Sequence, residues 1–275
     1  MATEKDKFIE VRKVIHKKSP TLAKWLPGPI MSYLERTIHE DDINDIMYRF
    51  KDQKGLEFVD SLLDSLDVEV ILEGAENIPT TDSVIFASNH PLGGLDGIAF
   101  MQVIGRHRKD VKFLVNDILL NVVNLEPLFV GVNKVGGQTK NAIAAIEEAY
   151  AGDLALLVFP AGLVSRKIDG KIVDLDWKKS FVSKAKKYKK DVIPVYIDGK
   201  NSNFFYNLAH WRQKLGVKFN IGMLYLVDEF FAQRGQRVVI KVGERIPYTQ
   251  FDNTKTEVQW AAEVKQLVYD LKTQK

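Results

Sequence analysis

Short apolar runs alternate with helical patterns along most of the chain. Apolar runs bounded by glycine, proline or polar residues predict buried strands, here at 68–72, 84–88, 111–115, 128–130, 154–158, 192–197 and 237–243. Helical patterns lie between and after them, at 95–105, 117–123, 139–150, 177–190 and 254–272. Strands that alternate with helices predict an α/β fold, with a mostly parallel central sheet flanked by helices.

The first part of the chain has helical patterns only. We therefore expect an N-terminal helical segment at 1–66 and an α/β domain at 67–275. The N-terminal segment is a candidate for association with the membrane. Residues 5–18 place apolar side chains on one helical face and Lys and Arg on the other. Such a helix fits an anionic membrane surface, and it equally fits packing on the domain with a solvated basic face. The lysine-rich stretch 177–190 leaves the same choice open between a solvated face and docking on anionic lipid or an acidic carrier protein.

Bulk composition narrows the function classes. The 275 residues are 45% hydrophobic and 27% charged, which is typical of a globular protein, and the net charge of +3 argues against a dedicated nucleic-acid binder. There is no Cys, which excludes disulfides and thiol nucleophiles. Five His without a His-x-x-x-His pair predict no metal site. The sequence shows neither a signal peptide nor a membrane-spanning apolar run, so we expect a cytoplasmic protein that contacts the membrane from its inner face.

The strand at 84–88 leads directly to candidate chemistry. It ends at Asn89 and His90, and Asp96 follows His90 by six positions. Open α/β sheets keep reactive groups beyond the carboxyl ends of their strands. The intervening turn contains Pro91, Gly93 and Gly94, which permit a tight turn and close approach to a ligand. We expect Asn89, Gly93 and Gly94 to contribute to substrate binding. A turn that returns the carboxylate to the imidazole makes a general base, while the alternative is that His90 caps a turn and Asp96 caps the next helix.

A second strand ends in a similar way. After the strand at 154–158 the chain reads Phe-Pro-Ala-Gly-Leu-Val-Ser-Arg, which contributes Pro160, Gly162, Ser165 and Arg166. Amides at this turn are suited to an anion or an oxyanion, and Arg166 to a phosphate or carboxylate. The alternative is a plain turn into a hairpin, because 167–172 carries Asp-Gly at its centre. Farther on, Pro194 within 192–197 predicts an edge strand or a bulge.

Three motifs together carry a family resemblance. Asn-His-Pro-Leu-Gly-Gly-Leu-Asp-Gly from Asn89, Phe-Pro-Ala-Gly from Phe159 and Val-Ile-Pro-Val from Val192 stand in the order found in the glycerophospholipid acyltransferase family, of the lysophosphatidic acid acyltransferase type. The resemblance covers roughly residues 66–245. The motif sequences look most like those of a bacterial branch of the family. This branch includes acyltransferases that make amino-acid-containing lipids, such as ornithine and glycine lipids.

The resemblance implies roles for particular residues. His90 would be the general base and Asp96 its orienting carboxylate, with no metal, no cofactor and no covalent acyl-enzyme. The chain departs from the family by one extra residue between His90 and Asp96, and by Ala161 and Val164 where Glu and Arg are usual. Lys134 or Arg166 could replace the Arg of the family's second motif, which contacts the acceptor's phosphate. These departures put glycerol phosphate in doubt as the acceptor.

The sequence therefore predicts an acyltransferase of membrane lipid synthesis. An acyl thioester, either acyl-CoA or acyl carrier protein, would donate a fatty acyl group to the hydroxyl of a lysophospholipid or of an N-acyl amino acid. The expected partners are the donor, the lipid acceptor and the membrane surface, with no nucleic acid. Two alternatives remain, N-acylation of an amino acid and a non-catalytic lipid-binding or membrane-docking module. An α/β hydrolase is disfavoured because the Gly-x-Ser-x-Gly elbow is missing.

Overall fold

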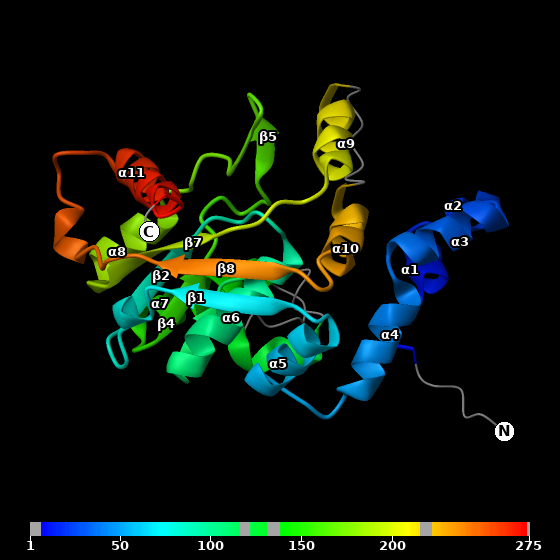
Figure 1. Cartoon of the computed structure of the whole chain (residues 1–275), viewed down its shortest axis with the longest axis horizontal. Helices are drawn as coiled ribbons and strands as arrows, with labels where there is room; N and C mark the ends of the chain where they lie inside the picture. Colours follow the sequence, from blue (N-terminus) through cyan, green and yellow to red (C-terminus); the bar gives the residue numbers. More distant parts are fainter. Residues whose placement is uncertain (1–6, 116–121, 131–137, 215–221, 274–275) are drawn as a thin grey trace. The chain divides into compact units, whose positions relative to one another are not determined.

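The chain forms two compact units. The computed structural model describes residues 7–115, 122–130, 138–214 and 222–273. The larger unit comprises the described parts of 54–201 and 235–275, and the smaller unit those of 1–53 and 202–234 (Figure 1). The sequence places α5 (Leu56–Ser65) in the N-terminal segment, yet this helix belongs to the larger unit. Residues 202–234 belong to the smaller unit, although they follow the strands of the α/β part.

A six-stranded sheet forms the centre of the larger unit, in the order β1-β8-β7-β2-β4-β3. The strands are β1 (Glu69–Glu73), β2 (Val84–Ser88), β3 (Val111–Phe113), β4 (Ala155–Val158), β7 (Asp191–Ile197) and β8 (Arg237–Val242). Neighbouring strands are parallel except β7 and β8, which are antiparallel. The predicted α/β fold with a mostly parallel sheet is therefore confirmed.

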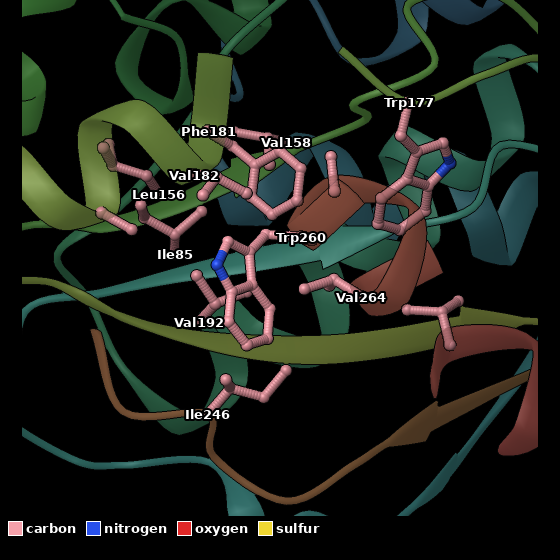
Figure 2. Close-up of a cluster of buried hydrophobic side chains, with 14 of the residues drawn as sticks. Ile85, Leu156, Val158, Trp177, Phe181, Val182, Val192, Ile246, Trp260 and Val264 are labelled. Atoms are coloured by element: carbon pink, nitrogen blue, oxygen red, sulfur yellow. The ribbon is translucent and has the colours of Figure 1, made fainter. Parts of the chain in front are cut away.

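Helices cover both faces of this sheet. The helices of the larger unit after α5 are α6 (Gly94–His107), α7 (Gln138–Ala151), α8 (Ser180–Tyr188) and α11 (Glu257–Asp270). Alternate residues of β2 serve the two faces. Ile85 packs in a core with side chains of α8 and α11, such as Phe181 and Trp260 (Figure 2). Phe86 meets Phe100 of α6 edge to face, with ring centroids 6.5 Å apart. All five residues of β2 are buried, which explains the uninterrupted apolar run in the sequence.

Most predicted elements are confirmed within a few residues, with one clear error. The strand predicted at 128–130 is instead the end of a 3₁₀-helix, η3 (Val123–Leu128), followed by a single bridge between Phe129 and Phe113. Pro127 lies inside this 3₁₀-helix, directly before the predicted strand, and its fixed φ is compatible with a helical turn there. Most of the helix predicted at 117–123 lies outside the described residues. Two further 3₁₀-helices are η1 (Ala75–Asn77) and η4 (Tyr248–Gln250).

Pro194 lies within an interior strand, so the expected edge position is wrong. The expected bulge is present on the neighbouring chain segment. Val195 faces Val242 and Val192 faces Ile246, so 243–245 lie opposite 193–194 and the partner segment carries one extra residue. The Gly243 amide donates to the Pro194 carbonyl at 2.8 Å. The missing N–H of Pro194 therefore falls where the regular ladder is already interrupted.

The smaller unit is helical. It contains α1 (Val11–Lys18), α2 (Pro20–Trp25), α3 (Gly28–Thr37), α4 (Glu40–Arg49), α9 (Asn203–Lys214) and α10 (Gly222–Ala232). The Glu40 carboxylate accepts from the Val11 amide at 2.9 Å and from Lys7 at 3.1 Å, which fixes the start of α1. Val11 is buried, whereas Phe8 and Val14 are 43% and 44% exposed. Only part of the apolar face predicted at 5–18 is therefore packed within the described residues.

Candidate active site

Asn89 extends the pairing of β2 with β7 by one residue. Its side-chain amide donates to the Ile197 carbonyl at 2.8 Å, and its side-chain oxygen accepts from the Ile197 amide at 2.7 Å. The side chain is buried and therefore replaces a backbone group in the ladder. His90 is the next residue, just beyond the carboxyl end of the strand, as the sequence predicts.

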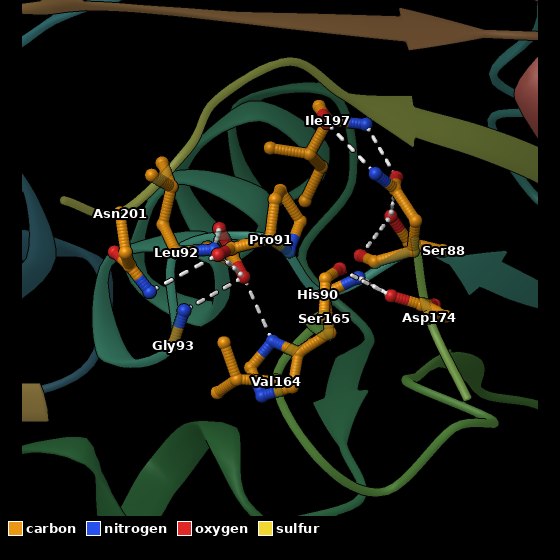
Figure 3. Close-up of polar contacts among 12 residues, drawn as sticks. Ser88, His90, Pro91, Leu92, Gly93, Val164, Ser165, Asp174, Ile197 and Asn201 are labelled. Atoms are coloured by element: carbon orange, nitrogen blue, oxygen red, sulfur yellow. Dashed lines mark hydrogen bonds and ion pairs between the residues drawn. The ribbon is translucent and has the colours of Figure 1, made fainter. Parts of the chain in front are cut away.

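His90 and Asp96 form a hydrogen-bonded pair. His90 Nδ1 lies 2.8 Å from Asp96 Oδ2, and the Asp96 side chain is fully buried. The same carboxylate accepts from the Leu92 amide at 2.8 Å and from the Gly93 amide at 3.0 Å (Figure 3). The turn thus folds back as expected, and one extra residue between His90 and Asp96 is compatible with direct contact. Asp96 also bonds to the amide that precedes α6, so the predicted capping interaction and the His–Asp pair exist together.

The local backbone explains why glycine begins this helix. Gly93 is the N-cap residue of α6 and has φ 87°, a conformation that residues with a Cβ rarely adopt. Gly94 is the first residue of α6, and Asp96 lies in its first turn, where the helix dipole favours an anion. Burial raises the pKa of the Asp96 carboxyl, whereas its hydrogen bonds from His90, Leu92 and Gly93 favour the charged form.

The His90 ring is also held from its flat side. It stacks on Phe159, with ring centroids 4.1 Å apart and an interplanar angle of 16°. Phe159 in turn meets Phe113 edge to face at 5.3 Å. The His90 side chain is 16% exposed, and within the described part of the chain no hydrogen bond to its Nε2 is formed. Nδ1 donating to a carboxylate leaves a lone pair on Nε2, which is the arrangement of a general base.

The second predicted turn adjoins the first through Phe159. The Gly162 amide donates to the Phe159 carbonyl at 3.0 Å, and the Lys178 amide donates to the Pro160 carbonyl at 3.1 Å. Gly162 has φ 68°, and a Cβ there would lie 3.0 Å from Lys178 Nζ. The positive φ favours glycine, whereas the flexible end of Lys178 could move aside from a Cβ. Pro160 and Gly162 therefore shape a turn whose first side chain touches His90.

The other predicted site residues, Ser165, Arg166 and Lys134, are not part of the His90–Asp96 pair. Ser165 is buried, and its hydroxyl donates to Asp174 at 2.5 Å. Arg166 begins the hairpin of β5 (Arg166–Ile168) and β6 (Lys171–Val173), and its guanidinium donates to the Val164 carbonyl at 2.7 Å. The predicted hairpin is confirmed, with Asp169 and Gly170 both at positive φ. Lys134 lies outside the described residues.

Sequence reasoning missed two residues that position His90. The Phe159 ring stacks on the His90 imidazole, although the sequence analysis named Phe159 only as part of a motif. Asp174 accepts from the His90 amide at 3.2 Å. A signal for Asp174 was available in the hairpin, because its register pairs Arg166 with Val173 and therefore places Ser165 opposite Asp174.

Comparison with known proteins decides the family. A family model described as acyltransferase matches residues 13–274. The chain belongs to this acyltransferase family. This acyltransferase is 45% identical over 265 residues to the lyso-glycine lipid O-acyltransferase of Bacteroides thetaiotaomicron, covering 96% of this chain and 97% of that protein. It is 41% identical to the protein of the same name from Phocaeicola vulgatus, covering 96% of this chain and 95% of that one.

A solved structure is also similar. The crystal structure of the 1-acyl-sn-glycerophosphate acyltransferase PlsC from Thermotoga maritima aligns with a TM-score of 0.46 and 19% identity, covering 88% of this acyltransferase and 96% of that chain. In the described ranges of this acyltransferase, every helix is too short or too polar to cross a bilayer.

Proposed function

We propose that this acyltransferase moves a fatty acyl group from an acyl thioester to the hydroxyl of a lyso-glycine lipid, an N-acylated glycine whose acyl chain carries a 3-hydroxyl. Two curated relatives that share 45% and 41% identity bear this activity in their names. Ala161 and Val164 stand where acyltransferases of glycerol phosphates usually have Glu and Arg, which favours an acceptor without a phosphate.

The observation that carries the mechanism is the hydrogen-bonded His90–Asp96 pair, 2.8 Å apart, in which Asp96 is fully buried. Asp96 holds Nδ1–H and stabilises the imidazolium that forms. His90 Nε2 takes the proton of the acceptor hydroxyl while the hydroxyl oxygen attacks the thioester carbonyl. The tetrahedral intermediate then collapses, the carbon–sulfur bond breaks, and the imidazolium returns the proton to the thiolate. The products are the ester and a free thiol, so no covalent acyl-enzyme is required.

The start of α6 supports stabilisation of the tetrahedral oxyanion. The first amides of a helix have no acceptor within the helix, and the helix dipole is positive there. Asp96 uses the amides of Leu92 and Gly93. We assign the next amides, of Gly94 and Leu95, to the oxyanion.

The proposed acceptor is a lipid, so we place the enzyme on the inner face of the cytoplasmic membrane. The smaller unit has several large apolar side chains in contact with water, namely Phe8, Val14, Trp25, Ile30, Tyr33 and Phe204, with Trp25 81% exposed. Tryptophan and tyrosine suit the membrane interface, and lysine and arginine of α1 would attract anionic lipid. Either acyl-CoA or acyl carrier protein would supply the thioester.

The test is a product assay with purified protein. Lyso-glycine lipid, lysophosphatidic acid or free glycine is offered with acyl-CoA or acyl carrier protein, and products are identified by mass spectrometry. We expect a diacylated glycine lipid with an ester bond. His90→Ala should lower its formation by about 10²- to 10⁴-fold, the usual contribution of a general base.

A matched control is available at the C-terminal end of α6, far from the turn that carries His90. His107 bonds through Nδ1 to the Val103 carbonyl of its own helix at 2.9 Å and does not approach Asp96. His107→Ala should retain turnover. Formation of the ester at an equal rate by His90→Ala would refute the mechanism. Products from lysophosphatidic acid or glycine alone would refute the proposed acceptor.

A further inference from the structure

A buried carboxylate that the proposed mechanism does not use lies behind His90. Asp174 follows the hairpin β5–β6 and is 1% exposed. Its Oδ1 accepts from the His90 amide at 3.2 Å and from the Ser165 hydroxyl at 2.5 Å (Figure 3). Its Oδ2 accepts from Trp177 Nε1 at 2.9 Å. One carboxylate thus joins the end of β2, the turn after β4 and the segment before α8.

The backbone of His90 is held at both of its polar groups. Its N–H donates to Asp174, and its carbonyl accepts from the Ser165 amide at 2.8 Å. His90 lies beyond the last residue of β2, where ladder partners from β4 and β7 end. The Ser165–Asp174 pair therefore supplies the contacts that the sheet no longer provides, and these contacts set the position from which the imidazole projects.

The hairpin and α11 fix this pair in turn. The hairpin register places Ser165 opposite Asp174, one pair beyond the Arg166–Val173 pair. The Asp174 amide donates to the Tyr269 hydroxyl at 2.8 Å, and Lys265 Nζ donates to the Asp174 carbonyl at 2.8 Å. Burial, and next the nearby charge of Asp174, raise the pKa of Tyr269, which therefore remains a neutral hydroxyl.

We propose that Asp174 is a positioning residue for acyl transfer, which fixes the backbone of His90 and the Phe159–Ser165 turn relative to each other. The stacked rings of His90 and Phe159 come from the two segments that Asp174 joins, beyond the last pair of the β2–β4 ladder, where Asp174 adds a further link between them. A carboxylate is needed because all three groups that face it are donors. An asparagine of the same size would place an N–H₂ group against one of those donors. The inference rests on the proposed function, since it assigns Asp174 to the reaction of His90.

The test compares Asp174→Asn with the control variant Val182→Ala. Val182 is a fully buried residue of α8 in the same hydrophobic cluster as Trp177, and it makes no hydrogen bond to Asp174. Steady-state kinetics with lyso-glycine lipid are measured at a temperature where both variants are folded. We expect Asp174→Asn to lower kcat by about 10- to 100-fold, as misplacement of a catalytic group does, with the KM of the acceptor within about threefold of wild type. Val182→Ala should change kcat by less than about twofold at a similar loss of Tm.

Hydrogen–deuterium exchange gives a readout that does not depend on activity. In Asp174→Asn we expect faster exchange in peptides that cover 90–97 and 160–166, with little change there in Val182→Ala. Ser165→Ala removes one of the donors to Asp174 and is the second variant if Asp174→Asn does not fold. It should show the same pattern of exchange and a smaller loss of kcat.

The outcomes separate the two proposals. A wild-type enzyme without His90-dependent ester formation overturns the proposed function, and exchange then decides alone whether Asp174 holds the two segments together. With an active wild type, equal kcat in the Asp174→Asn and Val182→Ala variants, or a rise in acceptor KM alone, overturns the positioning role. A loss of kcat together with faster exchange in both segments supports it.

Discussion

Gly97 of α6 lies one contact away from the ring stack that supports His90. A Cβ added at Gly97 would lie 2.9 Å from Cε1 of Phe113. Phe113 is buried and meets Phe159 edge to face at 5.3 Å, and Phe159 carries the His90 ring at 4.1 Å. Gly97→Ala therefore pushes on a short series of rings that ends at the proposed general base.

The expected magnitude follows from these distances. Ordinary contact begins at 3.4 Å, so the Phe113 ring must move by about 0.5 Å. Overpacking a core costs about 1–3 kcal/mol, and replacing glycine by alanine within a helix returns about 0.5–1 kcal/mol. We expect a net loss of about 1 kcal/mol in the free energy of unfolding. Because a displacement of about 1 Å at a catalytic group can cost 10²-fold, a shift of half that size should lower kcat about tenfold.

The assay combines denaturant unfolding with kcat for ester formation, and Gly105→Ala provides the matched control. Gly105 lies on the same helix, and a Cβ there would lie 2.3 Å from Leu56 of α5, which takes no part in the ring series. Because the overlap at Gly105 is larger, this control should lose at least as much stability as Gly97→Ala and still keep kcat within about twofold of wild type. If Gly97→Ala loses stability but turns over as fast as wild type, the ring stack does not position His90.

Two further predictions concern Asp96 and Glu147. Asp96→Asn should lower kcat by about 10²- to 10⁴-fold in steady-state assays, because His90 loses the partner that orients it, and a kcat within threefold of wild type would contradict that role. The Glu147 carboxylate of α7 accepts from Lys184, Lys187 and Tyr188 of α8, with Lys184 first among the groups that lower its pKa from 4.5 to about 2. A lowered pKa in the folded state stabilises the protein above pH 4.5, and the stabilisation is lost as the pH falls toward 2. Glu147→Gln should therefore lower Tm at pH 7, and thermal unfolding at descending pH should show the difference shrinking below pH 4.5; a constant difference would contradict the assignment.

Local patterns were sufficient for the elements that carry His90 and the hairpin. The apolar run at 84–88 predicted β2 because a strand buried on both faces requires it. Asp169 and Gly170 predicted the hairpin because a two-residue turn with positive φ favours these residues. The His90–Asp96 pair could also be predicted from a local pattern, since both residues belong to one glycine-containing turn. Its motif also carried the family resemblance that the family model and the curated relatives confirm.

By itself, the sequence determined the order and type of most elements and the short-range geometry of the turn from His90 to Asp96. Only the tertiary structure decided which strands are neighbours, that Pro194 lies inside the sheet, and that the Asn89 side chain pairs with Ile197, 108 positions away. It also decided that Asp174 bonds to His90 across 84 positions. The physical reason is that periodicity and turn preferences act over a few residues, whereas hydrogen bonds between distant segments depend on how the sheet brings the ends of its strands together.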